Sequence, residues 1–499
     1  MIGGLWKSTS TVALAAAAGL FVSGVAMPSA KAADLGGDCC ADLEERVAEL
    51  EATTARKGNR RVSLTVTGQV NRSILLWDDG HNSGAHFGVD NTNSSSRFSF
   101  LGDARISPKM KAGFEIMIEL EGTNASSRVN QLNEDGSIPG TTYFGTAAGG
   151  PGAPPNAGNS DSFFGDARRV AGWIEHADFG RVTLGRWETA GAVGTIDLGG
   201  IGVVTGFGGV SLLNAGFFLR NGDGDFIGTS WSAFLDPSQY QSRQEVLRYD
   251  SPTWAGFVLS ASISEAAGDF TGTNWGVMLR YAGDFSGFRV AAGIGYEHIG
   301  DVTTPAQVIA PPGGNYGVRE PDLDAWGGAL SIMHVASGLF LQGSYQAVAY
   351  NHTSPASSGN SGYWGDSGNA SKRDTDWWQI QGGIAKNWFG IGNTVLYGEY
   401  ARLNDWGAAQ GTGRDFAADG GGTPAALGAG FVALNDVTSS EATVWGLGIV
   451  QNIDAAATEL YLGYRNFSLD LNSGATCSDG GSCDVQDMHL VTGGMRIRF

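Results

Sequence analysis

The sequence predicts an all-β protein, a transmembrane antiparallel β-barrel of about 16 strands with a short N-terminal periplasmic helix. Three observations lead to this prediction. Segments of roughly ten residues alternate apolar and polar side chains along most of the chain. The mean hydropathy is only −0.09, although 10% of the residues are aromatic. The chain also ends on an aromatic residue, Phe499, which closes such a segment. Since a bilayer offers no water to unpaired backbone groups, a spanning sheet has to close on itself, and the last strand must pair with the first.

Residues 1–32 have the features of a signal peptide. Lys7 precedes an apolar run over residues 12–22, and Ala30-Lys31-Ala32 provides a cleavage site of small residues. We therefore predict export to the bacterial outer membrane, with cleavage after Ala32. A retained membrane helix is the alternative, but the apolar run is short for a bilayer.

Residues 33–60 are predicted to form a helical, coiled-coil-like segment in the periplasm. Leu43, Val47, Leu50 and Thr54 follow one another at coiled-coil spacing. A trimeric barrel would hold three copies of this segment close together, and a contact with peptidoglycan is also possible. A solvated helix without a partner is the alternative.

The predicted barrel covers residues 61–499. Its candidate strands have a side-chain period of two and are separated by short turns or long polar loops. They are residues 62–76, 96–106, 110–122, 167–177, 181–188, 245–251, 256–266, 273–282, 288–299, 322–334, 339–351, 375–388, 394–404, 440–452, 458–470 and 487–499. Their number is even, as in single-chain bacterial barrels. The turns at 107–109, 178–180, 284–287 and 336–338 are short, so we place this end of the barrel in the periplasm.

The first and third candidate strands show the two faces of the wall. In the first, apolar residues share one parity and Ser, Thr, Gln and Asn share the other; Arg72 is the exception on the apolar face and indicates a patch covered by protein. In the third, Phe114, Ile116 and Ile118 face lipid, while Glu115 and Glu119 face the lumen. Carboxylates inside a barrel imply water there.

The net charge of −19 argues against nucleic acid as a partner. An acidic balance is compatible with a cation-preferring pore, but charge on solvated loops is the favoured explanation. The four cysteines form two close pairs, as expected in an oxidising compartment. Cys477 and Cys483 bracket a turn-prone loop and are predicted to form a disulfide, whereas the adjacent Cys39 and Cys40 are poorly placed to bond each other.

Several segments resemble the porins of alphaproteobacteria, of the rhizobial type. They are Arg-Val-Ser-Leu-Thr-Val-Thr-Gly-Gln-Val at 61–70, Arg-Phe-Ser-Phe-Leu-Gly-Asp-Ala-Arg at 97–105, Gly-Arg-Val-Thr-Leu-Gly-Arg at 180–186 and Gly-Met-Arg-Ile-Arg-Phe at 494–499. The resemblance implies a homotrimer of sixteen-stranded barrels in outer-membrane lipid and lipopolysaccharide. It also implies passive diffusion of small hydrophilic solutes and a third outer loop that folds inward to narrow the pore.

Residues 189–244 form the loop best suited to that role. The segment is long and rich in Gly, Phe and Leu, so it is unlikely to float in water. Folded inward, it would present acids to a wall of arginines and create a transverse field at a constriction. The predicted constriction residues are Arg97, Arg105, Arg169, Arg181, Arg186, Glu115, Glu119, Asp197, Asp223, Asp225 and Asp236. Alternatively, several of these arginines only pair with Glu115, Glu119 or Glu175 inside the wall.

No cofactor is predicted. Asn221, Asp223 and Asp225 resemble the start of a calcium loop, but the twelfth position is Ser232 rather than Glu, which excludes an EF-hand and leaves only weak Ca²⁺ binding. The seven histidines lack metal-ligand spacing.

The principal prediction is a porin, not an enzyme. Neither a nucleophile elbow nor a phosphate loop appears where a strand could present it, so an outer-membrane hydrolase is a weak alternative. A role as a cell-wall anchor could coexist with transport. The stronger alternative is an oligosaccharide-selective channel, in which tryptophans would line a sugar path; the candidates are Trp275, Trp326, Trp377, Trp378, Trp388, Trp406 and Trp445. Most of these at strand ends are better interpreted as an interfacial girdle.

Overall fold

The structure, a computed structural model, describes most of the barrel. The described residues are 62–120, 124–132, 167–191, 193–206, 213–235, 243–266, 269–300, 302–303, 319–320, 323–350, 371–372, 374–410, 431–477 and 483–499. The predicted signal peptide, the predicted helix within residues 33–60, Cys39, Cys40 and Asp236 lie outside them.

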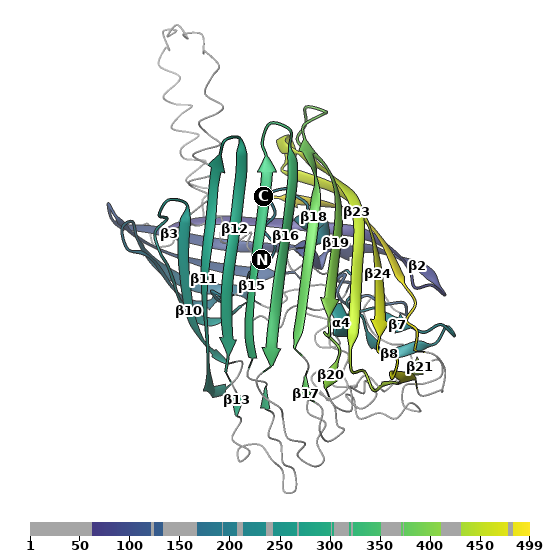
Figure 1. The fold of residues 1–499 in the computed structure, drawn as a ribbon. Coiled ribbons are helices and arrows are strands. Elements are labelled where there is room, and N and C mark those ends of the chain that lie inside the picture. Colours follow the sequence, from purple (N-terminus) through teal and green to yellow (C-terminus); the bar gives the residue numbers. More distant parts are fainter. Residues whose placement is uncertain are drawn as a thin grey trace.

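Sixteen antiparallel strands form a closed barrel (Figure 1). In barrel order they are β1 (Ser63–Asp78), β3 (Arg97–Ser107), β4 (Met110–Glu119), β5 (Ala167–His176), β6 (Gly180–Trp187), β9 (Gln244–Asp250), β10 (Phe257–Ala266), β11 (Asp269–Phe285), β12 (Phe288–Ile299), β15 (Leu323–His334), β16 (Leu339–Tyr350), β18 (Thr375–Lys386), β19 (Thr394–Asn404), β23 (Ser440–Ile453), β24 (Thr458–Leu471) and β26 (Met488–Arg498). The prediction of about 16 strands is therefore confirmed.

Short two-residue strands and loop elements lie outside this wall. They are β13 (Val302–Thr303), β14 (Arg319–Glu320), β17 (Ser371–Lys372), β20 (Ala409–Gln410), β21 (Phe431–Val432), β22 (Leu434–Asn435) and β25 (Thr476–Cys477). Within the described part of the chain, none of the helices has the length and apolar character needed to cross a membrane.

Closure depends on the pairing of the first strand with the last. Residues 69–78 of β1 pair with β26, and residues 63–69 of β1 pair with β3 on the other edge. Phe499 continues this ladder, since its N–H donates to the Gly68 carbonyl at 3.0 Å and its own carbonyl accepts from the Gly68 N–H at 2.9 Å. A Cβ at position 68 would lie 2.6 Å from the Phe499 ring, so the close approach of the terminal ring requires glycine there.

Two element boundaries were predicted wrongly. β1 continues past residue 76 into a hairpin with β2 (Ser83–Asp90), a strand that the sequence did not indicate because its glycines and histidine break the alternation of apolar side chains. The segment 284–287 is not all turn. β11 runs to Phe285, and only Ser286 and Gly287 form the turn, with φ of 48° and 84°. Two consecutive positive φ values are those of a type I′ hairpin turn, which matches the twist of the strands.

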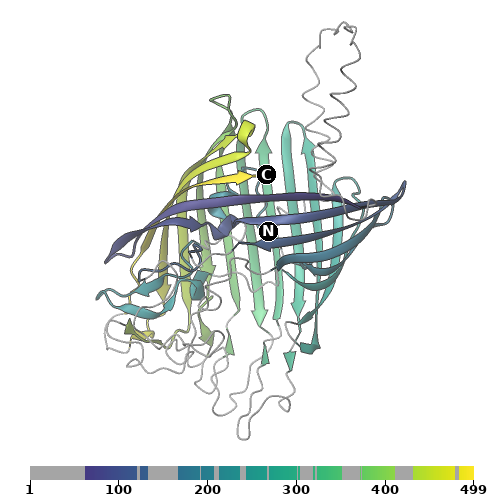
Figure 2. The same cartoon turned by 180° about the vertical axis from the view of Figure 1, so that it is seen from behind.

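Short turns gather at one end of the barrel and long loops at the other. We call these the turn end and the loop end. In Figure 1 the hairpin turns of β11–β12 and β15–β16 point upward, and the loop end points downward. Viewed from behind, the tilted strand β1 crosses the full width of the barrel (Figure 2). Lys109 in the β3–β4 turn donates to Asp178 in the β5–β6 turn at 2.6 Å, and this bond lowers the pKa of the Asp178 carboxyl.

The two faces of the wall follow the predicted parity. On β1, Leu64, Val66 and Ile74 are exposed on the outside, whereas Leu75 is fully buried on the inside. Arg72 stands on the outer face, and its guanidinium lies 3.6 Å from the buried Asp90 carboxylate. The apolar outer band and the polar inner face are those of a barrel whose outside contacts lipid and whose inside contacts water or protein.

Candidate functional site: the lumen and its loop

The loop between β6 and β9 enters the lumen and follows the inner wall. Ala190 N–H donates to Ser262 Oγ of β10 at 2.8 Å. Further along, Thr195 Oγ1 lies 3.0 Å from Ser344 Oγ of β16. At its far end, the Thr205 carbonyl accepts from Arg465 of β24 at 2.9 Å. Residues 190–206 therefore line the wall from β10 round to β24.

The middle of this segment is held by apolar contacts as well. It contains α3 (Gly202–Thr205), which follows Ile201. Ile201, Val203 and Val204 are buried in a cluster whose wall members are Phe340, Val395, Tyr397, Val450 and Tyr461. Within α3, the Val203 and Val204 carbonyls accept from the side-chain amides of Asn91 and Asn93 at 3.0 and 2.7 Å. The loop is thus anchored at both sides of the lumen.

The second part of the loop fills much of the loop end of the barrel. Residues 213–235 contain β7 (Phe218–Arg220), β8 (Phe226–Ser230) and α4 (Ser232–Leu235). We call this segment the plug. Its apolar side chains in the main buried cluster are Leu213, Phe217, Leu219, Ile227, Trp231, Phe234 and Leu235. They pack against inward side chains such as Leu75, Trp77, Trp377, Leu403 and Phe467. These apolar side chains of the loop lie inside the barrel, against its inner wall.

A set of arginines lies on the inner wall from β3 to β11. Over most of these strands, residues 190–206 make no described contact with the wall. We call this set the arginine strip. Its members are Arg97 on β3, Arg168 and Arg169 on β5, Arg181 on β6, Arg243 and Arg248 at β9 and Arg280 on β11. Their carboxylate neighbours come from the wall and from the base of the loop: Glu115, Glu119, Glu175, Glu188, Asp250 and Glu297.

Most of the strip is tied into ion pairs. Arg169 Nη2 lies 2.6 Å from Glu188 and its Nη1 lies 3.4 Å from Glu115. Arg168 pairs with Glu119. These groups are nearly excluded from water. Removing one partner of a pair would therefore leave the other as an unpaired buried charge, which destabilises the fold.

A second group of the strip surrounds one aspartate. Arg248 Nη2 and Arg280 Nη2 lie 2.8 and 3.0 Å from Asp250 Oδ1, and Ser260 donates to the same carboxylate at 2.6 Å. Arg248 Nη1 also donates to the Glu188 carbonyl at 2.9 Å, which ties the base of the loop to β9. Arg181 stands beside this group, with its guanidinium carbon 4.0 Å from the Trp173 ring centroid.

The predicted constriction residues separate into two groups. Arg97, Arg169, Arg181, Glu115 and Glu119 lie together on the inner wall. As in the alternative considered from sequence, Glu115 and Glu119 pair with arginines inside the wall, and Glu175 pairs with Lys111 at 3.4 Å.

The other predicted residues lie apart from the strip. Arg105 is exposed near the turn end. Arg186 pairs in register with the outward Val170 and so stands on the outer face of β6. Asp197 belongs to the loop, but its carboxylate accepts from the N–H groups of Gly200 and Gly202, both at 2.7 Å. Asp223 and Asp225 lie in the β7–β8 turn at the loop end, away from the arginine strip.

Sequence reasoning missed several charged residues that complete this arrangement. Arg248 and Asp250 are two residues apart on one strand, so they share the inward face, and this spacing was visible in the sequence. Glu188 and Arg168 could not be found in this way, because Glu188 follows the end of β6 and Arg168 lies where the β4–β5 register shifts.

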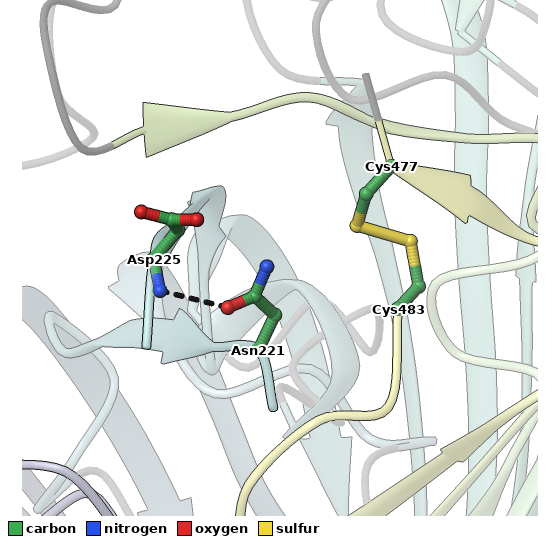
Figure 3. The surroundings of a disulfide bond; sticks show 4 residues. All are labelled: Asn221, Asp225, Cys477 and Cys483. Atoms are coloured by element: carbon green, nitrogen blue, oxygen red, sulfur yellow. Dashed lines mark hydrogen bonds between the residues drawn. A yellow bond between two sulfur atoms is a disulfide. The ribbon is translucent and has the colours of Figure 1, made fainter. Parts of the chain in front are cut away.

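Figure 3 shows the β7–β8 turn beside the Cys477–Cys483 disulfide. The disulfide predicted from the sequence is present, with a Cα–Cα distance of 5.5 Å. Asn221 Oδ1 accepts from Asp225 N–H at 2.7 Å, and the Asp225 carboxylate is directed away from that amide (Figure 3). Among the described residues, no group of three or more His, Cys, Asp or Glu is arranged to hold a metal ion.

The tryptophans considered for a sugar path mostly do not face the lumen. Trp275, Trp326, Trp378 and Trp445 are exposed on the outer face. Trp377 and Trp406 are buried in the core that the plug forms with the wall, and Trp388 is exposed in the β18–β19 turn. The outer four match the girdle interpretation instead.

A closed barrel with an apolar outside, a charged inside and a loop folded into its lumen is an outer-membrane channel by its architecture. The match to known families is specific: residues 11–473 match the Gram-negative porin family, and the chain belongs to it.

Solved structures with a similar fold share little sequence with this chain. A loop-deletion mutant of OmpT, an outer membrane protein of Vibrio cholerae, is 11% identical, with a TM-score of 0.46, 88% of this chain covered and 100% of that chain. OmpF of Salmonella typhi in complex with daunomycin is 13% identical, with a TM-score of 0.45 and coverage of 87% and 97%. OprB of Pseudomonas putida is 11% identical, with a TM-score of 0.41 and coverage of 94% and 99%. Among curated proteins, none matches this chain.

Proposed function

We propose that the chain forms a water-filled channel in the outer membrane through which small hydrophilic solutes and ions diffuse passively. The observation that carries this function is the charged inner wall behind an apolar outer wall. Toward the turn end, Asp103, Arg105 and Asp284 are exposed on the inner face of the lumen. Exposed charges on an inward face require water in the lumen. Between these residues and the loop end, the path runs between the arginine strip and residues 193–206.

Planar-bilayer recording tests this function. We expect stepwise, ohmic conductance when purified, refolded protein inserts, and no block by maltooligosaccharides. Saturable block by the sugar would instead favour the oligosaccharide-selective channel. Protein that shows the heat-modifiable gel mobility of a folded barrel but never conducts would contradict the channel function altogether.

We also propose that the functional unit is a homotrimer, and the outer surface supports this. Trp and Tyr alternate in a continuous girdle over β11 to β24, and adjacent rings within each Trp–Tyr pair are 5.1–5.3 Å apart. The girdle consists of Trp275, Tyr296, Trp326, Tyr345, Trp378, Tyr400, Trp445 and Tyr464. Such rings mark the lipid–water interface.

The girdle does not extend over β1 and β3 to β6. The exposed large hydrophobic side chains on those strands, within the described residues, are all aliphatic: Leu64, Val66, Val70, Ile74, Leu76, Ile106, Ile116, Val170, Ile174, Val182 and Leu184. This face lacks the Trp–Tyr girdle, and its outward phenylalanines, Phe98, Phe100 and Phe114, are only partly exposed. A largely aliphatic face of this kind suits a contact between barrels. Arg72, paired with Asp90 on this face, would also be shielded from lipid there.

Replacing Leu184 by arginine is expected to dissociate this trimer. Leu184 is 67% exposed on β6, and a guanidinium buried between barrels would lack a partner. Ile294→Arg on β12 is the matched control, since Ile294 is 62% exposed on the girdle side. On semi-native gels and by chemical crosslinking, Leu184→Arg should run as a monomer and Ile294→Arg as a trimer. Equal trimer fractions in both variants would exclude this face as the contact.

The remaining parts of the proposal rest on the sequence. The rhizobial-type resemblance at residues 61–70 and 494–499 supports a source among the alphaproteobacteria. A helical segment at 33–60 in the periplasm would lie at the turn end, within reach of peptidoglycan. Lipopolysaccharide would surround the girdle. We propose no enzymatic role, because the family to which the chain belongs consists of channels.

A further inference from the structure

We propose that the Cys477–Cys483 disulfide is a redox-sensitive constraint on the plug: while it is intact it holds the β7–β8 hairpin in the lumen, and its reduction loosens that hairpin. The structural part of this inference stands without the channel function. Its consequence for conductance rests on that proposed function, because a looser plug changes ion flow only if the lumen conducts.

One strand of the plug hairpin is connected to Cys477 through a series of short strands. β8 pairs with β21 through Phe226 and Ile227, and β22 follows β21 after one residue. β22 pairs in turn with β25, which ends on Cys477. Each of these pairings is only two residues long. Pairings this short are marginal by themselves, so they depend on what the ends of the strands are attached to.

The other strand of the hairpin is connected to Cys483. Shortly after this cysteine, Val485 forms an isolated β-bridge with Asn221, the residue that follows β7. The next N–H, that of Gln486, donates to the Arg220 carbonyl at 2.8 Å. Figure 3 shows the disulfide beside the turn that contains Asn221. The disulfide therefore closes a ring of contacts that runs from β8 through β21, β22 and β25, across the two sulfur atoms, and back to β7.

The disulfide also belongs to the apolar cluster that holds the plug. Cys477 is 4% exposed and lies in the same cluster as Ile227 and Trp231 of the plug, and Cys483 and Val485 pack against that cluster. Reduction leaves both sulfur atoms as thiols, which are still apolar, so it removes the covalent constraint and little of the buried surface. The expected result is a more mobile hairpin inside an intact barrel, because the wall keeps its own hydrogen-bonded ladders.

The chemistry requires a reductant that reaches the loop end, and a soluble dithiol is the class that fits. It supplies two electrons and two protons: the S–S bond breaks, each cysteine becomes a thiol, and the dithiol closes to its own disulfide. Cys483 is only partly buried, whereas Cys477 is buried, so we expect the attacking thiolate to bond to the Cys483 sulfur first. A soluble disulfide reverses the step by the same exchange. With the short turns in the periplasm, as predicted from their length, the Cys477–Cys483 bond faces the outside of the cell.

Hydrogen exchange of the folded protein, with and without a dithiol reductant, tests the constraint. Reduction should speed exchange of the backbone amides in 218–230 about tenfold, as expected for loss of a cross-link that closes a short loop, and should leave β10 to β12 unchanged. Reoxidation should restore the slow exchange. Cys477→Ala/Cys483→Ala should exchange fast with or without reductant. Cys39→Ser/Cys40→Ser is the matched control for the other thiols, and it should respond to the reductant as the wild type does.

Planar-bilayer recording is the second measurement. Reductant added on the loop-end side should raise the mean current and the current noise of the wild type and leave the double alanine variant unchanged. Unchanged exchange in 218–230, in protein whose disulfide is reduced according to its mass, overturns the constraint. Faster exchange throughout the wall overturns it as well, because the disulfide would then stabilise the whole barrel. A conducting channel whose hairpin loosens without a change in current overturns the effect on conductance. A hairpin that loosens in folded protein that never conducts supports the constraint and contradicts the channel function.

Discussion

Arg465→Leu is expected to destabilise the barrel by about 3–5 kcal/mol. Arg465 Nε and Nη2 donate to the two oxygens of Glu399 at 2.6 and 2.8 Å, and both side chains are almost completely buried. The pair spans β23 at Gly446, where a Cβ would lie 2.9 Å from Arg465 Cγ. Removing the guanidinium leaves the Glu399 carboxylate with Gln381 as its remaining donor, at 3.2 Å. It also removes the bond to the Thr205 carbonyl, which holds the far end of the loop.

The measurement is urea unfolding of refolded protein, followed by tryptophan fluorescence. Arg402→Leu is the matched control, on the same strand as Glu399, because Arg402 pairs with Glu441 on the outer face with side chains 40% and 36% exposed. Exposed pairs contribute roughly 0–1 kcal/mol. The double variant Arg465→Leu/Glu399→Leu should recover much of the lost unfolding free energy, because it leaves no unpaired carboxylate buried in the wall. A single variant as stable as the Arg402 variant would contradict this account.

The wall of this protein could be predicted from its sequence because its pattern is local. A period of two assigns each side chain to the lumen or the membrane, and this was sufficient to place Leu64, Val66 and Glu115 on their correct faces. This pattern failed for β2. The glycines and histidine of β2 do not alternate between apolar and polar side chains, but its backbone pairs with β1.

The site was less predictable because its contacts are not local. Inward parity located Arg97, Arg169 and Arg181, but not their partners. Whether Asp197 faces an arginine or binds backbone N–H groups depends on the path of the loop along the wall from β10 to β24, and the sequence contains no signal for that path. The pairing of the arginine strip with its carboxylates is therefore a property of the folded lumen.

The plug holds the second part of the loop at the loop end of the barrel. Trp231→Ala is expected to release the plug from the wall. Trp231 is 1% exposed, and its ring centroid lies 6.1 Å from that of Phe467 on β24. Truncating a buried tryptophan costs about 3–5 kcal/mol, because the transfer free energy is lost and a cavity remains. This cost falls on the plug rather than on the barrel, since the strands keep their hydrogen-bonded ladders.

The described polar contacts of the plug are mainly those of β7 and β8: β8 pairs with β21, and the Gln486 N–H donates to the Arg220 carbonyl at 2.8 Å. They do not replace the apolar packing that Trp231 provides. Gln131 Nε2 donates to the Phe218 carbonyl at 2.8 Å, and Arg220 lies 3.0 Å from Asp79. We therefore expect single-channel recordings of Trp231→Ala to show a larger mean conductance and more current noise, and limited proteolysis to cut within 213–235 faster than in the wild type. Trp254→Ala is the control, because Trp254 is 79% exposed at the turn end. Wild-type conductance together with wild-type protease resistance in Trp231→Ala would mean that the plug does not depend on its apolar core. The hydrogen bonds of residues 190–206 to the wall would then be sufficient to fix the whole loop.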